Sequence, residues 1–185
     1  MRFNKHLNLQ GEHAFLSPSQ YHWIHYTPER LVERWTATQA AEYGTLQHEY
    51  AHREIVEDRL SDLVGTIGLY INDAIRYRMQ CEQILYYSEN CFGTADTISF
   101  RYKTLRIHDL KTGVIPGSVH QLEIYAALFC LEYEIDPFSI KIELRIYQSN
   151  EVLVYEADPE DIVFIMDKIV EFDKVITHRR LEEES

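Results

Sequence analysis

The sequence predicts an α/β (α+β) protein in which a central mixed β-sheet is flanked by helices. Helical periodicity dominates the chain up to about residue 79 and recurs in two later segments. Extended segments rich in Ile, Thr, Phe, Tyr and Leu lie between residues 80 and 157. The resulting order is helices, three strands, a helix, two strands and a final helix. Such an order normally buries one sheet between layers of helices.

The chain has 185 residues, which is long enough for one domain with a sizeable core. A hydrophobic content of 45% and an aromatic content of 12% argue against disorder. We therefore expect a single domain over residues 1–185. Its expected parts are a helical N-terminal part at about 15–79, a core at about 80–157 and a C-terminal helix at about 159–180.

Charge and cysteine content restrict the class of protein further. The net charge of −12 disfavours a protein that holds long duplex DNA by charge alone, although it leaves room for a basic local groove or for a partner that brings the DNA. Cys81, Cys91 and Cys130 lack C-x-x-C spacing and suit a reducing compartment. Three cysteines cannot supply the four ligands of an iron–sulfur cluster, so no cluster is expected.

The helical part begins after an irregular lead-in of about 14 residues. Ser17-Pro18 and Thr27-Pro28 each combine a cap with a first-turn proline and predict two helix starts. A further helix is predicted over residues 36–60, within which Gly44 would allow close backbone approach. Another helix is predicted over residues 61–79. No apolar run is long enough for a membrane span, and no secretory signal opens the chain.

The strands and the later helices follow in order. Residues 81–88 alternate enough for a first strand. Residues 92–102 and 105–111 predict a hairpin divided by Lys103-Thr104, a turn without the usual Gly or Asn. Ser118 is the predicted N-cap of a helix with one apolar stripe. The stripe consists of Val119, Leu122, Ala126, Phe129 and Tyr133.

Beyond Pro137 the chain predicts two more strands and a last helix. Residues 140–146 alternate as a half-buried strand, and Ser149-Asn150 turns the chain into a strand at 152–155. Asp158-Pro159 caps the final helix. The apolar residues expected on its inner face are Ile162, Ile165, Ile169 and Phe172.

The predicted hairpin brings two carboxylates and an ammonium group together. With a loop at Lys103-Thr104, Asp96 lies opposite Lys111 and diagonal to Asp109, roughly 7–8 Å away between backbones. All three side chains share one face, because side chains alternate along a strand. A three-residue loop would shift this pairing. The alternative interpretation is a solvated hairpin with an ordinary surface ion pair.

Two nearby carboxylates repel each other unless a cation lies between them. An all-oxygen site suits Mg²⁺ or Mn²⁺, which can activate water and stabilise charge on a phosphoryl oxygen. A lysine beside the metal can orient or deprotonate the attacking water. The residues therefore supply the parts needed for phosphodiester hydrolysis.

Three motifs in this order resemble the PD-(D/E)XK nuclease superfamily, in particular the RecB-type and lambda-exonuclease-like phage nucleases. They are G-x-x-D at Gly93–Asp96, D-x-K at Asp109–Lys111 and Q-x-x-x-Y at Gln121–Tyr125. A pattern similar to G-T-x-x-H occurs at Gly44–His48, and Glu82 lies on the preceding strand. The resemblance covers about residues 15–133. It implies a restriction-endonuclease-like αβββαβ core with an N-terminal helical extension.

The resemblance also implies roles for these residues. His48, Asp96 and Asp109 would bind one or two Mg²⁺ or Mn²⁺ ions, with the Leu110 carbonyl as a further ligand. Glu82 would reach a metal directly or through water, and Lys111 would handle the nucleophilic water. Gln121 and Tyr125 would position the scissile phosphate or the terminal nucleotide. His52, one helical turn beyond His48, is the competing histidine.

The leading hypothesis is a metal-dependent DNA exonuclease that acts in phage DNA recombination, replication or degradation, in the cytoplasm of the host. One alternative is a structure-specific DNA endonuclease with the same site. Another is a non-catalytic adaptor that retains the fold and binds a replication or recombination protein. DNA is the expected partner, and no membrane partner is expected. The polarity of digestion, the strand preference and the oligomeric state stay open.

Overall fold

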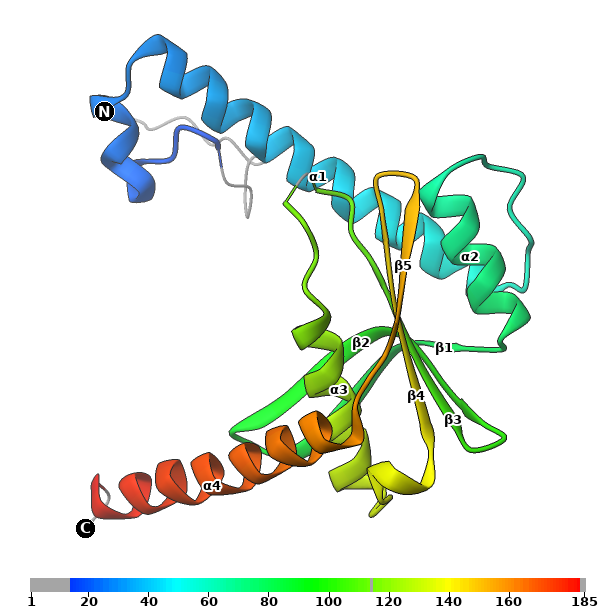
Figure 1. The fold of residues 1–185 in the computed structure, drawn as a ribbon. Coiled ribbons are helices and arrows are strands. Elements are labelled where there is room, and N and C mark those ends of the chain that lie inside the picture. The colour runs from blue at the N-terminus through cyan, green and yellow to red at the C-terminus, as the bar shows by residue number, and fades with distance from the viewer. Residues whose placement is uncertain (1–13, 114, 184–185) are drawn as a thin grey trace. The chain divides into compact units, whose positions relative to one another are not determined.

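The computed structural model describes residues 14–113 and 115–183 (Figure 1). Within it the chain falls into two compact units, one ending at Tyr43 and the other beginning at Gly44. The single domain expected over residues 1–185 stays a prediction. The irregular lead-in expected for the first 14 residues lies, apart from its last residue, outside the described residues.

The first unit consists of a 3₁₀ helix, η2 (Pro18–His25), and the beginning of helix α1 (Pro28–Val56). Trp23 Nε1 donates a hydrogen bond of 2.9 Å to the carbonyl of Ser17, the N-cap residue of this helix. Helix α1 runs without a break, so the separate helix start expected at Thr36 is wrong. The proline at the first turn is a sufficient start signal, and Gln39, Ala40 and Ala41 are good helix formers that continue it.

Helix α1 ends at Val56 rather than near residue 60, and Asp58 beyond it has a left-handed φ of 54°. Helix α2 (Thr66–Arg76) is shorter than the helix expected over 61–79. Ser61 does not begin it, because the backbone of Ser61 is bound by a side chain. Its N–H donates to Asn72 Oδ1 (2.8 Å), and its carbonyl accepts from Asn72 Nδ2 (2.9 Å).

The second unit is built on one mixed five-stranded sheet in the order β1-β2-β3-β4-β5. The strands are β1 (Gln80–Ser88), β2 (Cys91–Arg101), β3 (Thr104–Leu110), β4 (Lys141–Gln148) and β5 (Glu151–Glu156). Strands β3 and β4 are parallel, and the other neighbours are antiparallel. Helix α3 (Val119–Glu132) makes the crossover between β3 and β4, and η3 (Pro137–Ser139) precedes β4. Helix α4 (Pro159–Glu183) follows β5. The predicted α/β fold with a central mixed sheet is therefore confirmed.

Helices cover both faces of this sheet (Figure 1). Helices α3 and α4 pack on one face, in a core that includes Ile107 and Leu144. Helix α2 and the end of α1 pack on the other face around Leu110 and Tyr147. Phe172 was expected on the inner face of α4, but it is 55% exposed, because the second half of α4 continues past the core.

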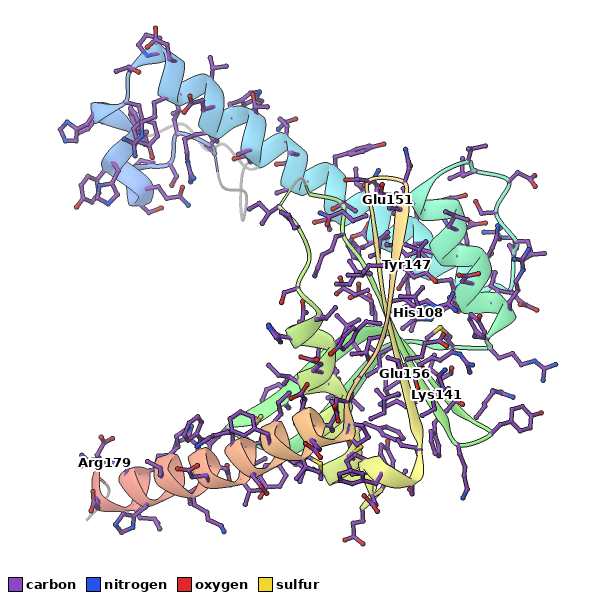
Figure 2. The ribbon with its side chains drawn as sticks, viewed as in Figure 1. His108, Lys141, Tyr147, Glu151, Glu156 and Arg179 are labelled. Atoms are coloured by element: carbon purple, nitrogen blue, oxygen red, sulfur yellow. The ribbon has the colours of Figure 1, made fainter. Side chains whose placement is uncertain are left out.

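A polar network lies on the α2 face of the sheet, where Figure 2 labels His108 and Tyr147. The Tyr147 hydroxyl donates to Asp73 (2.7 Å) and lies 3.3 Å from His108 Nδ1. Arg145 donates to the same Asp73 carboxylate at 2.9 Å. His108 is fully buried, and burial, followed by the charges of Arg145 and Arg106, lowers its pKa to about 3. His108 is therefore neutral in the folded protein.

The turn between β2 and β3 lies one residue earlier than predicted. Tyr102 and Lys103 form it, both with left-handed φ (52° and 59°), and Arg101 pairs with Thr104. The Lys103 carbonyl accepts a hydrogen bond from the Lys141 N–H (2.8 Å), which fixes the turn against the start of β4. The expected loop at Lys103-Thr104 is therefore wrong.

The observed register also changes the expected neighbour of Asp96. Thr97 pairs with His108, so one further step places Asp96 across from Asp109. The expectation that Asp96 lies opposite Lys111 is wrong. Strand β3 ends at Leu110, and Lys111 follows it in the loop. The two carboxylates are thus direct cross-strand neighbours instead of diagonal ones.

Candidate functional site

Asp96 and Asp109 form the centre of the candidate site. Asp109 is buried (3% exposed) near the end of β3, and Asp96 Oδ2 accepts a hydrogen bond of 3.1 Å from the Leu110 N–H. Burial and, second, the negative charge of Asp109 raise the pKa of Asp96, whereas Leu110, His48 and Lys111 lower it. Ionisation of Asp96 is therefore disfavoured first by its burial and second by the charge of Asp109. A cation between the carboxylates would remove this penalty.

Lys111 lies against the Asp109 carboxylate. Its Nζ is 3.0 Å from Oδ1 and 2.9 Å from Oδ2, and it donates a further hydrogen bond of 3.1 Å to Gln121 Oε1. Oδ2 of Asp109 is buried and, despite this ion pair, accepts no hydrogen bond of favourable geometry within the described residues. The contact of Lys111 with Oδ2 is therefore an ion pair rather than a well-aligned hydrogen bond.

Helix α3 places the Q-x-x-x-Y motif beside Lys111. Ser118 caps the helix as predicted, because its side chain accepts a hydrogen bond from the His120 N–H. Gln121 Nε2 donates to the Tyr125 hydroxyl at 3.4 Å. Tyr125 in turn packs on Gly93, where an added Cβ would lie 2.9 Å from the ring. Polar contacts therefore run without interruption from Asp109 through Lys111 and Gln121 to Tyr125.

Helix α1 contributes His48, which lies beside Asp96. His48 Nδ1 lies 3.8 Å from Asp96 Oδ2. Gly44, one turn earlier, permits this approach, because a Cβ there would lie 2.6 Å from Thr112 Oγ1 in the loop after Lys111. The close backbone approach predicted for Gly44 is thus confirmed.

The competing histidine and Glu82 form a second pair. His52 Nε2 lies 3.9 Å from Glu82 Oε2. Glu82 has a left-handed φ of 49° and no cross-strand partner between Cys81↔Thr97 and Gln83↔Ala95. Left-handed backbone at a non-glycine residue in a strand costs about 1–3 kcal/mol and often accompanies a functional site.

The left-handed residue also switches the alternation of β1. Cys81 packs with the cluster on the α2 face, whereas Leu85 belongs to the core on the α3 face. In a regular strand these two side chains, four residues apart, would share one face. The switch exposes the Glu82 carboxylate beside the two histidines of α1.

A small cavity of about 30 Å³ lies between these groups. It is lined by His48, His52, Tyr70, Cys81, Glu82 and Asp96. This volume exceeds what one water molecule needs, so an ion or a water fits. Burial, followed by the charges of Glu82 and Asp96, raises the pKa of the Cys81 thiol to about 11. Cys81 is therefore a neutral thiol at physiological pH, which leaves oxygen and imidazole as the donors.

The sequence did not single out Tyr70 or Cys81 for this site. Tyr70 is 3% exposed, and no motif or spacing distinguished it from the other apolar positions of α2. The charges of Asp96 and Asp109 add to the effect of burial in raising its pKa well above the usual range. Its hydroxyl therefore stays protonated beside the carboxylates.

The donor set fits a hard divalent cation. Carboxylate oxygens with one imidazole are ligands that Mg²⁺ and Mn²⁺ accept. Among residues 14–113 and 115–183, no three His, Cys, Asp or Glu side chains lie close enough to form a ready-made metal cage. Asp109 points to Lys111 instead, as expected for a carboxylate that balances its charge with the nearest ammonium group. The Leu110 carbonyl as a ligand stays a prediction.

The fold and the site define an α/β protein with a paired carboxylate–lysine centre between the middle of β2 and the end of β3. Comparisons of the chain with protein-family models, with curated proteins and with solved structures found no match. Helices long and apolar enough to cross a membrane are absent from the part of the chain that the structure describes. The function is therefore argued from the site.

Proposed function

We propose that this protein is a metal-dependent deoxyribonuclease, an exonuclease that hydrolyses phosphodiester bonds from DNA ends. The observation that carries the proposal is the meeting of Asp96 and Asp109 with the polar chain through Lys111 to Gln121. These residues come from two strands, a loop and a helix, and each of them carries a group that phosphodiester hydrolysis needs.

Each side chain would have a separate role in metal binding or hydrolysis. Asp96, Asp109 and the His48 imidazole would hold the ion, and Glu82 would act through a water. A bound Mg²⁺ or Mn²⁺ supplies Lewis acidity for a phosphoryl oxygen and for the attacking water. Lys111 Nζ is held between Asp109 and Gln121, so it can orient a water beside the carboxylates.

Gln121 and Tyr125 would bind a phosphate rather than react. They offer an amide N–H₂ and a phenolic hydroxyl on one face of α3, one turn apart. Both groups are neutral hydrogen-bond donors that can orient a phosphate oxygen without adding charge. Their contribution would be geometric, because small errors in alignment cost large factors in rate.

An exonuclease is favoured over an endonuclease by the space beside Lys111. A cavity of about 320 Å³ lies between α1, the loop before α2 and the turn between β4 and β5. Amide and hydroxyl side chains line it, including Gln47, Thr66, Thr112 and Asn150, and among the described residues of its lining only Lys111 is charged. Such a space suits one terminal nucleotide, whereas duplex held at an internal site needs many cationic contacts.

We propose that the protein acts in phage DNA recombination, replication or degradation in the host cytoplasm, with a recombination or replication protein as partner. This setting rests on the resemblance of the motifs alone.

The experiment is a time course on covalently closed circular DNA and on the same DNA linearised, in Mg²⁺ and in Mn²⁺. We expect end-dependent loss of the linear form and persistence of the circle. Prompt linearisation of the circle would favour a structure-specific endonuclease. Intact DNA in every reaction would favour a non-catalytic adaptor.

A further inference from the structure

Among the residues that the structure describes, no strand pairs with the outer edge of β2 over its last three residues. The pairing of β1 with β2 ends at Gln80↔Ile98, and the chain before Gln80 turns away through Arg78, which has a left-handed φ of 52°. Ser99, Phe100 and Arg101 therefore have no partner from β1, although they pair with β3 on their other side.

The hairpin geometry determines which backbone groups face this open edge. In a two-residue hairpin the residues that flank the turn are hydrogen-bonded to each other, here Arg101 and Thr104. Hydrogen-bonded and non-hydrogen-bonded pairs alternate along an antiparallel ladder. The Phe100↔Leu105 pair is then a non-hydrogen-bonded one, so the N–H and the carbonyl of Phe100 point to the open edge.

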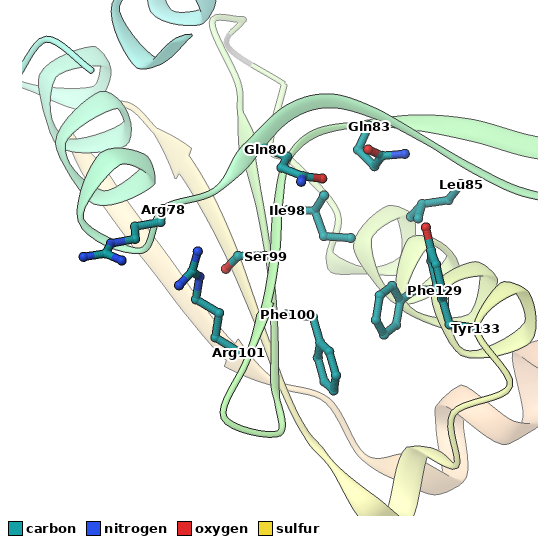
Figure 3. Close-up of a pocket in the computed structure, with 10 residues that line it drawn as sticks. All are labelled: Arg78, Gln80, Gln83, Leu85, Ile98, Ser99, Phe100, Arg101, Phe129 and Tyr133. Carbon is teal, nitrogen blue, oxygen red and sulfur yellow. The ribbon is translucent and has the colours of Figure 1, made fainter. Parts of the chain in front are cut away.

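A cavity of about 220 Å³ lies along this edge (Figure 3). Within the described part of the chain, its charged lining residues are Arg78 and Arg101, and none of the residues that line it is acidic. Neither arginine forms an ion pair with any other described residue, although the chain carries 30 acidic residues against 18 basic ones. By contrast, Arg106 and Arg145 both pair with Glu143. The two free guanidinium groups make the cavity locally positive.

The two sides of the strand differ in chemistry. Figure 3 shows Ser99 and the two arginines on one side of β2 and Phe100 with Phe129 on the other. The rings of Phe100 and Phe129 lie 5.2 Å apart, and Tyr133 continues the row at 4.9 Å from Phe129. Phe100 is 41% exposed and Tyr133 is 51% exposed, so both rings have area available for a ligand. A ligand in the cavity would lie across the strand edge. Its negative charge would face the two arginines, and its apolar part would face the aromatic rings.

We propose that this edge binds an extended peptide segment of a partner protein, in which acidic residues flank an apolar one, as an added β-strand. The residue opposite Phe100 would exchange backbone hydrogen bonds with it and place its apolar side chain on the aromatic row. Its two neighbours point to the opposite face, because side chains alternate along a strand, and their carboxylates would reach Arg78 and Arg101. Strand addition of this kind takes affinity from the backbone and specificity from alternate side chains.

Single-stranded nucleic acid offers the same negative charge and flat rings, but it explains less of the geometry. It would use the arginines and the aromatic row, yet it would leave the Phe100 N–H and carbonyl without the regular partner that a peptide supplies. The structure therefore favours the peptide, and nucleic acid binding becomes an outcome of the test.

The experiment measures fluorescence anisotropy of a labelled peptide with the core Thr-Asp-Phe-Asp-Thr, blocked at both ends, with the full chain in EDTA. We expect saturable binding that is weakened at least about tenfold in Arg78→Gln and in Arg101→Gln, because each loses a charged hydrogen-bond partner. Arg179→Gln, an exposed arginine on α4 that pairs with Glu182, is the matched control and should leave binding unchanged. Circular dichroism melts establish that each variant is folded.

Two further probes separate strand addition from mere charge attraction. The same peptide with an N-methyl group on its central residue keeps every side chain but loses the N–H for the Phe100 carbonyl, so it should bind at least about tenfold more weakly. Equal binding of the methylated peptide would overturn the proposal, as would binding that ignores Arg78→Gln and Arg101→Gln. Displacement of the peptide by an oligodeoxynucleotide with the same arginine dependence and no effect of methylation would assign the edge to nucleic acid. No binding, together with self-association of the arginine variants, would show that the arginines only protect an open edge from other sheets.

Discussion

Lys111 Nζ contacts both oxygens of the Asp109 carboxylate, at 3.0 Å from Oδ1 and 2.9 Å from Oδ2, while the same carboxylate lies across the strands from Asp96. The ammonium group thus balances one of two crowded negative charges. Asp96 has no comparable lysine or arginine partner among the described residues, and its pKa is raised. The free site therefore holds an excess of negative charge that a divalent cation would relieve.

Asp109→Asn should remove DNA cleavage while the fold stays intact. The change keeps the size of a buried side chain and removes the charge that crowds Asp96, so we expect turnover to fall at least about a hundredfold in Mg²⁺ and in Mn²⁺. Thermal unfolding should shift little. Cleavage at the wild-type rate in Mn²⁺ would show that Asp109 does not hold the metal.

Mg²⁺ or Mn²⁺ should raise the melting temperature of the wild-type protein. A ligand that binds only the native state at 100 times its Kd stabilises that state by about 2.7 kcal/mol. The shift should vanish in an Asp96→Asn, Asp109→Asn double variant. It should persist in a Glu182→Gln, Glu183→Gln control, which removes the same formal charge from the end of α4. Equal shifts in both double variants would indicate diffuse binding by the acidic surface.

Gly93→Ala should impair turnover through Tyr125. The added Cβ would lie 2.9 Å from the Tyr125 ring, so the ring must move and its hydrogen bond with Gln121 must change. Overpacking of this kind costs about 1–3 kcal/mol. We expect a fall in kcat that exceeds any loss of DNA affinity, and the same pattern for Gln121→Ala. Val175→Ala, at an exposed position on α4, is the control and should leave turnover unchanged. Equal loss in Gly93→Ala and Val175→Ala would contradict this role.

His108 should make the protein less stable in acid. Its folded-state pKa of about 3 lies below the usual 6.5, so between these values the unfolded chain binds more protons than the native state. This contribution to stability is complete above about pH 6.5 and is lost as the pH falls towards 3, by at most about 1.4 kcal/mol per pH unit. Urea unfolding from pH 4.5 to 7.5 measures it.

The comparison that isolates this effect uses two histidine variants. His108→Gln should lose part of the pH slope, whereas His178→Gln should keep it, because His178 is an exposed residue on α4 with a side chain that is 76% exposed. Parallel slopes for wild type and His108→Gln would show that His108 is protonated in the native state or that its burial is incomplete.

The sequence predicted the large features because they depend on periodic patterns. The apolar stripe of α3 and the alternation of β4 predicted these two elements. Of the six residues expected in the catalytic roles, Asp109 and Lys111 lie at the end of β3 and directly after it, and Gln121 and Tyr125 lie on α3 beside Lys111. Asp96 lies in the middle of β2, and Glu82 lies on β1. Local start and turn signals were less reliable. The polar group of Ser61 is a cap signal, but a side chain eleven residues away, Asn72, binds its backbone instead.

The hairpin register shows why the site could not be completed from sequence. The turn is fixed by a contact between Lys103 and Lys141, which are far apart in the chain, and no local pattern contains this information. The same holds for the pair of His52 and Glu82, which depends on the left-handed backbone of Glu82. Tyr70 lies in the lining of the cavity because α2 packs there, and its spacing alone is that of a core residue.

The left-handed backbone of Glu82 has a consequence for sequence variation in this protein. At a position with φ of 49°, the residue that fits without strain is glycine, followed by asparagine and aspartate. Here the position that structural stability alone would assign to glycine carries a long carboxylate. A library of substitutions at this position, sorted only for folding, should therefore become enriched in glycine and asparagine. Sorting for the activity of the site should return glutamate, so the two selections would measure separately what the backbone and the carboxylate each require.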